Sequence, residues 1–388
     1  MFGKRFVKWG CIGVVVLMMF FLVPGKINNA STMPNTDSTT QTNETQDTQK
    51  QIEELLATMT LREKICQMLF VTPERIAGGT SITKVDETVA ESMRIYPVGG
   101  ILYSVQNLVS QEQTAQMIAD TQALSTIPLF IAADEEGGTV NRLMKKLGTT
   151  YIGSMYDYKD QGVEIAYQNA YTIASDMASI GFTLDFAPVA DVWSNPKNKV
   201  IGKRAYSDDY EEAARLVSTA VSGFQDGGVM CTLKHFPGHG DTVEDSHKVS
   251  AYVNKTKEEL YAQELQPFVS GIAANAEFVM MGHVIVDSLD PENPASLSPV
   301  LIQDVLRKDL GFEGVVITDA LQMKAISDQY TVEETAIKAV LAGNDMLLEP
   351  VNVERTIDAL MDAVAQGIIS EERIDESVRR ILKLKVKE

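Results

Sequence analysis

The sequence predicts an α/β protein built as a single (β/α)₈ barrel. Three observations predict this fold class: eight short apolar runs, amphipathic stretches between them, and polar clusters after most of the runs. Short runs that are apolar at nearly every position are typical of parallel strands buried on both faces. An open, doubly wound sheet is the alternative, but its polar residues would gather at one switch point instead of following most strands.

The barrel is expected to span residues 52–388. Its strands are expected at residues 68–71, 100–103, 129–133, 183–186, 230–233, 278–281, 315–318 and 346–348. The amphipathic stretches that predict helices most clearly are residues 112–124, 210–225, 257–274 and 332–342. Strands and helices that alternate in this way are typical of barrel and doubly wound folds.

The first 51 residues are expected to lie outside the barrel. Basic residues at positions 4, 5 and 8 precede an uncharged run over residues 9–23, which is the pattern of a signal peptide or membrane anchor. Residues 1–27 are assigned to that segment, and the positive-inside rule then places the rest of the chain outside the cytoplasm. Residues 28–51 are rich in Thr, Asn, Gln, Ser and Asp, so we expect a flexible polar linker.

The composition excludes several classes of protein. With 34 basic and 53 acidic residues the net charge is −19, which argues against binding of nucleic acid through its phosphates. Three scattered cysteines cannot form a disulfide framework, and they include no CxxC pair. The expected protein is therefore an exported or anchored globular domain that folds without disulfides.

Charged residues follow the third and fourth predicted strands. Three consecutive carboxylates, Asp134 to Glu136, come directly after the third strand, and Arg142 follows them. Carboxylates at a strand end could accept hydrogen bonds from hydroxyl groups or bind a cation. Arg204 lies in the loop after the fourth strand and is a candidate because that loop is expected on the same face of the barrel.

The fifth predicted strand is followed by a loop that contains three of the four histidines. The loop reads KHFPGHGDT from Lys234 and continues to Asp245 and His247, so that His235, His239 and His247 lie close together in the sequence. Its proline and glycines indicate a loop of special backbone shape and exclude a regular helix.

Two chemistries fit this histidine cluster. The histidines could bind a metal ion, with His283 and a carboxylate such as Asp134 completing the set of ligands. Alternatively, Asp245 could orient His247 and adjust its pKa, which would make it a general acid/base near neutral pH. A single His–Asp pair is often only structural, but the density of the cluster favours a functional site.

Asp319 follows the seventh predicted strand directly. In a barrel this position lies at the carboxyl-terminal mouth, where catalytic groups gather. Asp319 could instead be the N-cap of the next helical turn, which is a common role of aspartate. A carboxylate at this position could also attack an anomeric carbon and form a covalent glycosyl-enzyme.

The loop from Lys234 to His247, together with Asp319 in the run ITDAL, closely resembles glycoside hydrolase family 3 and within it the β-N-acetylglucosaminidase branch. The resemblance runs from about Leu61 to the carboxyl terminus and implies a (β/α)₈ barrel that retains anomeric configuration. It implies that Asp319 is the nucleophile, that His247 is the general acid/base and that Asp245 is its dyad partner. A histidine in this role departs from the usual pair of carboxylates in retaining glycosidases.

The same resemblance implies binding roles for further residues. Sugar binding is implied for Asp134, Arg142, Arg204, Lys234 and His235. His239 and Asp191 match motif positions that support the site, and no metal or cofactor is implied. Glu135 and Thr139 depart from the Gln or His and the Arg that the family usually has there.

The resemblance implies a hydrolase that removes terminal β-linked N-acetylglucosamine. Because the predicted amino-terminal segment places the chain outside the cytoplasm, peptidoglycan fragments or related glycans are the expected substrates. Family 3 β-glucosidases usually take their acid/base from a second α/β domain, and the chain is expected to lack one because it ends at Glu388. A different family 3 β-glycosidase, a phosphorylase, a metal-dependent barrel hydrolase and a surface glycan-binding protein are the alternatives. The membrane is expected as a partner only through residues 1–27.

Overall fold

The structure is a computed structural model that describes residues 38–243 and 251–386, with side chains from residue 47 onward. Residues 45–388 form one compact unit, to which the following description applies. The predicted signal or anchor segment, residues 1–27, lies outside the described residues. Within the described ranges, no helix has both the length and the apolar character needed to cross a membrane.

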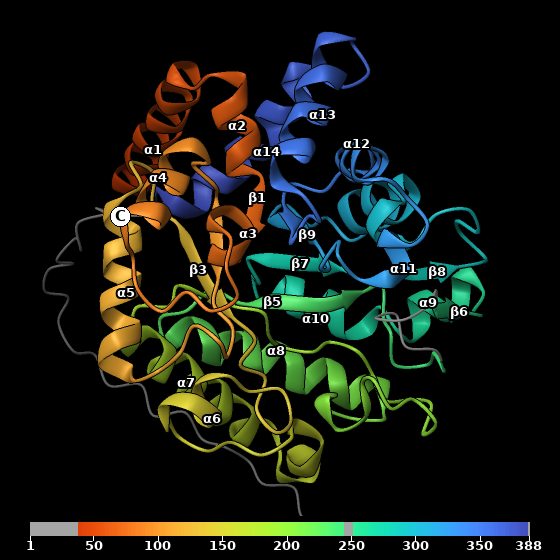
Figure 1. Ribbon diagram of the computed structural model, residues 1–388. Helices are drawn as coiled ribbons and strands as arrows, with labels where there is room; N and C mark the ends of the chain where they lie inside the picture. The colour runs from red at the N-terminus through yellow and green to blue at the C-terminus, as the bar shows by residue number, and fades with distance from the viewer. Residues whose placement is uncertain (1–37, 244–250, 387–388) are drawn as a thin grey trace, which may run out of the picture. The chain divides into compact units, whose positions relative to one another are not determined.

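The strands pair in parallel (Figure 1). They are β1 (Leu69–Val71), β2 (Gly100–Leu102), β3 (Phe130–Ala133), β4 (Leu184–Asp185), β5 (Thr232–Phe236), β6 (Ala251–Val253), β7 (Phe278–Met281), β8 (Val284–Val286), β9 (Val315–Thr318) and β10 (Leu347–Leu348). One sheet has the order β10-β1-β2-β3-β4, a second has the order β5-β7-β9, and β6 pairs with β8. The predicted α/β class with buried parallel strands is confirmed, whereas the short pair of β6 and β8 was not expected.

Isolated parallel bridges connect the two larger sheets at both edges. Leu184 on β4 pairs with Met230, which precedes β5, and Ile317 on β9 pairs with Met346, which precedes β10. The edge strands of the two sheets are therefore neighbours, and the strands from β1 to β4 follow one another in chain order.

Helices connect the strands. They are α1 (Ser38–Thr58), α2 (Leu61–Gln67), α3 (Pro73–Ala77), α4 (Glu87–Ile95), α5 (Gln111–Ala123), α6 (Leu143–Leu147), α7 (Val163–Ile180), α8 (Tyr210–Asp226), α9 (Lys257–Ala262), α10 (Gln266–Ala273), α11 (Lys324–Ser327), α12 (Val332–Ala342), α13 (Val353–Ala365) and α14 (Glu371–Lys385). Other helical elements are the 3₁₀ helices η1 (Met155–Gln161), η2 (Gly202–Arg204) and η3 (Ala295–Leu297), and the π-helix η4 (Val300–Asp309). Figure 1 shows β5, β7 and β9 side by side, with α10 in contact with both β5 and α8.

Three predicted boundaries differ clearly from the structure. The fifth strand, predicted at residues 230–233, is β5 at Thr232–Phe236, so Lys234 and His235 lie on the strand and not in the loop after it. The helix predicted for residues 257–274 is two helices, because Pro267 cannot continue a helix and instead lies in the first turn of α10. The second half of the linker predicted for residues 28–51 is helical, because α1 begins at Ser38. Ile52 and Leu56 of α1 are buried, and this packing stabilises a helix whose upstream residues are polar.

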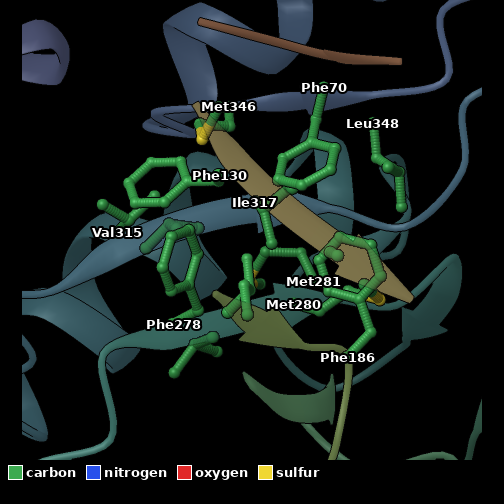
Figure 2. Packing of buried hydrophobic residues seen from close by; sticks show 14 of the residues in the cluster. Phe70, Phe130, Phe186, Phe278, Met280, Met281, Val315, Ile317, Met346 and Leu348 are labelled. Atoms are coloured by element: carbon green, nitrogen blue, oxygen red, sulfur yellow. The ribbon is translucent and has the colours of Figure 1, made fainter. Parts of the chain in front are cut away.

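The core lies between the strands and consists largely of aromatic and branched side chains. Figure 2 shows Phe130, Phe278 and Ile317 pointing toward one another from three different strands. The rings of Phe70 and Phe186 lie 5.2 Å apart between centroids, and those of Phe130 and Phe278 lie 5.1 Å apart. Apolar contacts thus fill the interior, and polar side chains gather beyond the carboxyl ends of the strands.

Candidate active site

The carboxyl ends of the strands surround a cavity of about 970 Å³. The sequence-predicted candidates in its lining are Asp134, Arg142, Arg204, Lys234, His235 and Asp319. They come from the segments after β3, β4 and β9 and from β5 itself. The structure therefore brings together side chains that lie as far apart in the sequence as Asp134 and Asp319.

Lys234 on β5 lies at the centre of an ion-pair network. Its Nζ lies 2.6 Å from Oε1 of Glu136 and 3.1 Å from Oδ1 of Asp134. The guanidinium of Arg204 donates to both carboxylate oxygens of Glu136 at 2.8 Å. Arg142 lies 3.4 Å from the second oxygen of Asp134. The network offers charged donors and acceptors that suit the hydroxyl groups of a sugar ring.

Burial and neighbouring charges shift the pKa values of Glu136 and Lys234 in opposite directions. Burial alone would raise the pKa of Glu136, but the charges of Arg204 and Lys234 outweigh it and hold that pKa well below its ordinary value. Burial would lower the pKa of Lys234, but the carboxylates of Glu136 and Asp134 outweigh it and raise that pKa. Glu136 and Lys234 are therefore both charged at neutral pH. Both carboxylates line the cavity, and the side chain of Asp134 is the more exposed of the two, at 25% against 2% for Glu136.

His235 is oriented by the buried carboxylate of Asp191. The two side chains meet with Nδ1 of His235 2.7 Å from Oδ2 of Asp191. Burial would raise the pKa of Asp191, but His235 and His239 outweigh it and keep that pKa low, so the carboxylate is ionised. Because an ionised carboxylate only accepts, Nδ1 of His235 carries a proton, and the carboxylate fixes the orientation of the ring. Asp191 thus holds the imidazole of His235 in place.

His239 is a second buried histidine of this loop. Its backbone N–H donates to Asp191 at 2.6 Å, and its Nδ1 lies 2.7 Å from the hydroxyl oxygen of Thr242. Burial lowers the pKa of His239, although the charges of Asp191 and Asp319 act in the opposite direction. His239 therefore supports the loop and lies within electrostatic reach of Asp319.

Asp319 is held by the backbone at the end of β9. Its N–H donates to the carbonyl of Met281 at 2.9 Å, and the N–H of Ala320 donates to Oδ1 of Asp319 at 2.7 Å. The N-cap of the next helix, α11, is Met323, with no side-chain cap. The alternative role of Asp319 as an N-cap is therefore wrong, and its carboxylate lines the cavity.

The first of the missed residues is Glu136. The sequence feature that pointed to it was the run of three carboxylates after β3, but that run did not indicate which carboxylate would join the ion-pair network. The carboxylate of Glu135 accepts backbone N–H bonds from Arg142, Leu143 and Met144, so it caps α6 instead.

A second missed group comes from the segments after β1, β9 and β10. Arg75 lies 3.1 Å from Oε2 of Glu349 and also contacts Gln322, and the backbone of Thr72 donates to Oε1 of Glu349 at 2.5 Å. All four residues line the cavity. The sequence could have indicated this group, because Glu349 directly follows a buried strand, as Asp319 does.

Asp245 and His247 lie outside the described residues, so the dyad stays a prediction. Val243, the last described residue before this segment, lines the cavity, and β6 begins at Ala251. The chain thus enters this segment from the cavity wall. Among the side chains that the structure describes, no three His, Cys, Asp or Glu residues gather as possible metal ligands.

The family described as "Glycosyl hydrolase family 3 N terminal domain" matches residues 60–384. The chain belongs to glycosyl hydrolase family 3. A solved family 3 β-N-acetylglucosaminidase from Paenibacillus sp. str. FPU-7 is 41% identical with a TM-score of 0.79, and the match covers 84% of this chain and 62% of that one. The predicted family is therefore confirmed.

Curated relatives have similar names. β-Hexosaminidase A of Pseudoalteromonas piscicida is 33% identical over 339 residues, which are 79% of this chain and 56% of that protein. A β-hexosaminidase of Stenotrophomonas maltophilia is 38% identical over 256 residues, which are 65% of this chain and 76% of that protein. This family 3 chain therefore spans a little over half the length of the first of these relatives.

Proposed function

We propose that this family 3 chain is a retaining β-N-acetylhexosaminidase that releases terminal β-linked N-acetylglucosamine. The observation that carries the proposal is that Asp319 shares one cavity with the network of Asp134, Lys234 and Arg204. A carboxylate at a strand end beside charged donors and acceptors suits nucleophilic attack on a sugar held by its hydroxyl groups. The names of the relatives support an N-acetylated amino sugar as the glycone.

In the first step, a carboxylate oxygen of Asp319 attacks the anomeric carbon. The bond from that carbon to the glycosidic oxygen breaks, and protonated His247 gives its proton to the leaving oxygen. The products are the free aglycone and a glycosyl ester on Asp319. Asp245 is proposed to orient His247 and to stabilise its positive charge before the transfer.

In the second step, neutral His247 takes a proton from water as the water oxygen attacks the same carbon. The ester bond breaks, and the carboxylate of Asp319 and the protonated histidine are regenerated. Two displacements on one carbon leave the anomeric configuration unchanged.

The cation-rich network is proposed to bind the non-reducing sugar. Lys234 and Arg204 are fixed by Glu136, so their remaining N–H groups are pre-oriented donors. Asp134 reaches the cavity and is proposed to accept from ring hydroxyls, together with Arg142 and His235 as further contacts.

Several features of the whole chain belong to the same proposal. The bridges at Met230 and Met346 support closure of the strands into a (β/α)₈ barrel, with residues 52–388 as the catalytic domain. Residues 1–27 are proposed as a signal peptide or membrane anchor, which makes the enzyme extracytoplasmic. Peptidoglycan fragments or related glycans are the substrates that suit such a location.

The activity is tested by hydrolysis of nitrophenyl β-N-acetylglucosaminide and nitrophenyl β-glucoside, each with and without inorganic phosphate. The proposal predicts strong preference for the amino sugar, a rate that does not depend on phosphate, and free N-acetylglucosamine as the product. Preference for the glucoside, or a sugar phosphate as the main product, would contradict it. Activity that is lost on chelation and restored by a divalent metal would support the metal-dependent alternative instead.

A further inference from the structure

His283 lies beside the proposed nucleophile but outside the cavity lining. It follows β7 after Gly282, and the residue is 1% exposed. Its Nε2 lies 3.1 Å from the carbonyl oxygen of Ala320, the residue after Asp319. Its Nδ1 lies 2.8 Å from the hydroxyl oxygen of Ser296.

These contacts assign the proton on the imidazole ring. The carbonyl of Ala320 can only accept, so Nε2 of His283 must carry a hydrogen. In the neutral ring Nδ1 then accepts from the hydroxyl of Ser296. Ser296 is itself held, because its N–H donates to Gly282 at 3.1 Å and its carbonyl accepts from the side chain of Asn344 at 2.8 Å. The imidazole therefore has a fixed orientation.

The peptide after the nucleophile is fixed on both sides by this arrangement. The carbonyl of Ala320 accepts from His283, and the N–H of Leu321, in the same peptide plane, donates to the carbonyl of Leu348 at 2.9 Å. On the other side, the N–H of Asp319 donates to the carbonyl of Met281, the last residue of β7. The N–H of Ala320, which holds Oδ1 of Asp319 at 2.7 Å, lies between these two fixed points.

We propose that His283 is a positioning residue for Asp319: its imidazole donates to the carbonyl of Ala320, fixes the Ala320–Leu321 peptide and thereby holds the carboxylate for attack on the anomeric carbon. This rests on the proposed function, because it assumes that Asp319 is the nucleophile. Oδ1 of Asp319 is the oxygen that the N–H of Ala320 holds.

The proposal predicts which kinetic constants change. His283 does not line the cavity, so its loss leaves the groups proposed to bind the sugar in place. A displaced nucleophile lowers the rate of attack, and a displacement on the order of 1 Å costs up to about 100-fold in rate. Loss of His283 is therefore expected to lower kcat and the rate of glycosyl-enzyme formation, with little change in KM.

The experiment compares four variants of the full chain. His283→Phe removes both nitrogen atoms, and His283→Gln supplies an amide that can donate to Ala320 in the place of Nε2. Ser296→Ala removes the partner of Nδ1. The matched control is Ser298→Ala, since Ser298 is equally buried in the neighbouring segment but its hydroxyl donates to Asp290 at 2.6 Å.

The readouts are kcat and KM with nitrophenyl β-N-acetylglucosaminide, the pre-steady-state rate of nitrophenol release, and the melting temperature. We expect kcat of His283→Phe to fall about 10- to 100-fold with KM within roughly a factor of two. His283→Gln is expected to recover most of that loss, and Ser298→Ala is expected to keep the wild-type kcat. A folded His283→Phe variant with wild-type kcat, a change in KM alone, or a His283→Gln variant as impaired as His283→Phe would overturn the proposal.

If His283→Phe does not fold, the two serine variants and His283→Gln decide the question. Ser296→Ala is then expected to have a lower kcat than both Ser298→Ala and His283→Gln, and equal kcat in all three overturns the positioning role. Failure of the proposed function would look different, because the wild-type enzyme itself would not release nitrophenol, or Asp319→Asn would be as active as the wild type.

Discussion

Nζ of Lys234 lies 2.6 Å from Oε1 of Glu136, and each side chain is only 2% exposed. Arg204, whose side chain is 13% exposed, binds the same carboxylate with two N–H groups, so Glu136 is shared by two cations. Removing one partner of a buried ion pair leaves an uncompensated charge, which costs more than the pair itself contributes. Glu136 is therefore the residue on which the geometry of Lys234 and Arg204 depends.

Glu136→Gln is predicted to destabilise the fold and to impair catalysis. The free energy of unfolding is expected to fall by about 3–5 kcal/mol, because two cations lose their shared negative charge. The value of kcat/KM is expected to fall by roughly 100-fold, since Lys234 and Arg204, the proposed donors to the sugar, lose their orientation. Chemical denaturation and steady-state kinetics measure the two effects.

The matched control for this prediction is Glu135→Gln. Glu135 is also buried, but it accepts from backbone N–H groups of α6, and glutamine keeps one acceptor oxygen for them. Glu135→Gln is therefore expected to lose less kcat/KM than Glu136→Gln. Equal losses in the two variants would show that the charge shared with Lys234 and Arg204 has no special role.

The sequence could identify Lys234 and Asp319 because each lies on or directly after a buried strand. Such a residue reaches the carboxyl-terminal edge whatever the details of the loop. The roles of Glu135 and Glu136 could not be separated in this way. Gly137 and Gly138 have φ angles of +83° and +59°, and this left-handed turn after the acidic run is a property of the folded loop.

The amino-terminal boundary of the folded unit was the least predictable feature. A polar segment such as residues 38–51 has no helical apolar periodicity of its own, so its composition indicated a flexible linker. The helix depends on long-range packing of Ile52 and Leu56, which a local pattern does not reveal.

Ile52→Ala is predicted to destabilise the protein by about 2–4 kcal/mol, because Ile52 is only 2% exposed and its loss leaves a cavity under α1. The midpoint of urea denaturation measures the effect. Glu54→Ala, an exposed position of the same helix, is the control and is expected to change stability by less than about 0.5 kcal/mol. If Ile52→Ala behaves like the control, α1 does not belong to the folded unit.

Lys385 is predicted to make stability depend on pH. Its Nζ donates to Gln67 and to the carbonyl of Gly99, each at 2.8 Å, and it lies 4.8 Å from the centre of the Phe130 ring. Burial lowers the pKa of Lys385 to about 7. The unfolded chain keeps this proton up to about pH 10.4, so it binds more protons than the folded chain between these values. The contribution of Lys385 to stability therefore rises as the pH rises from 7 to 10.

Lys385→Met removes this titration. The difference in unfolding free energy, variant minus wild type, is expected to decrease steadily when denaturation is measured at pH 7, 8.5 and 10. A difference that is the same at all three pH values would mean that Lys385 does not titrate in this range.

The most direct test of the central claim is to trap the glycosyl-enzyme and locate the bond. A 5-fluoro derivative of N-acetylglucosaminyl fluoride, which slows both steps but keeps a good leaving group, is incubated with the enzyme, and peptides are analysed by mass spectrometry. The account predicts one added fluorosugar on the peptide that contains Asp319, and none in Asp319→Asn. A sugar on any other residue, or turnover with inversion and no covalent species, would contradict the assignment of Asp319 as the nucleophile.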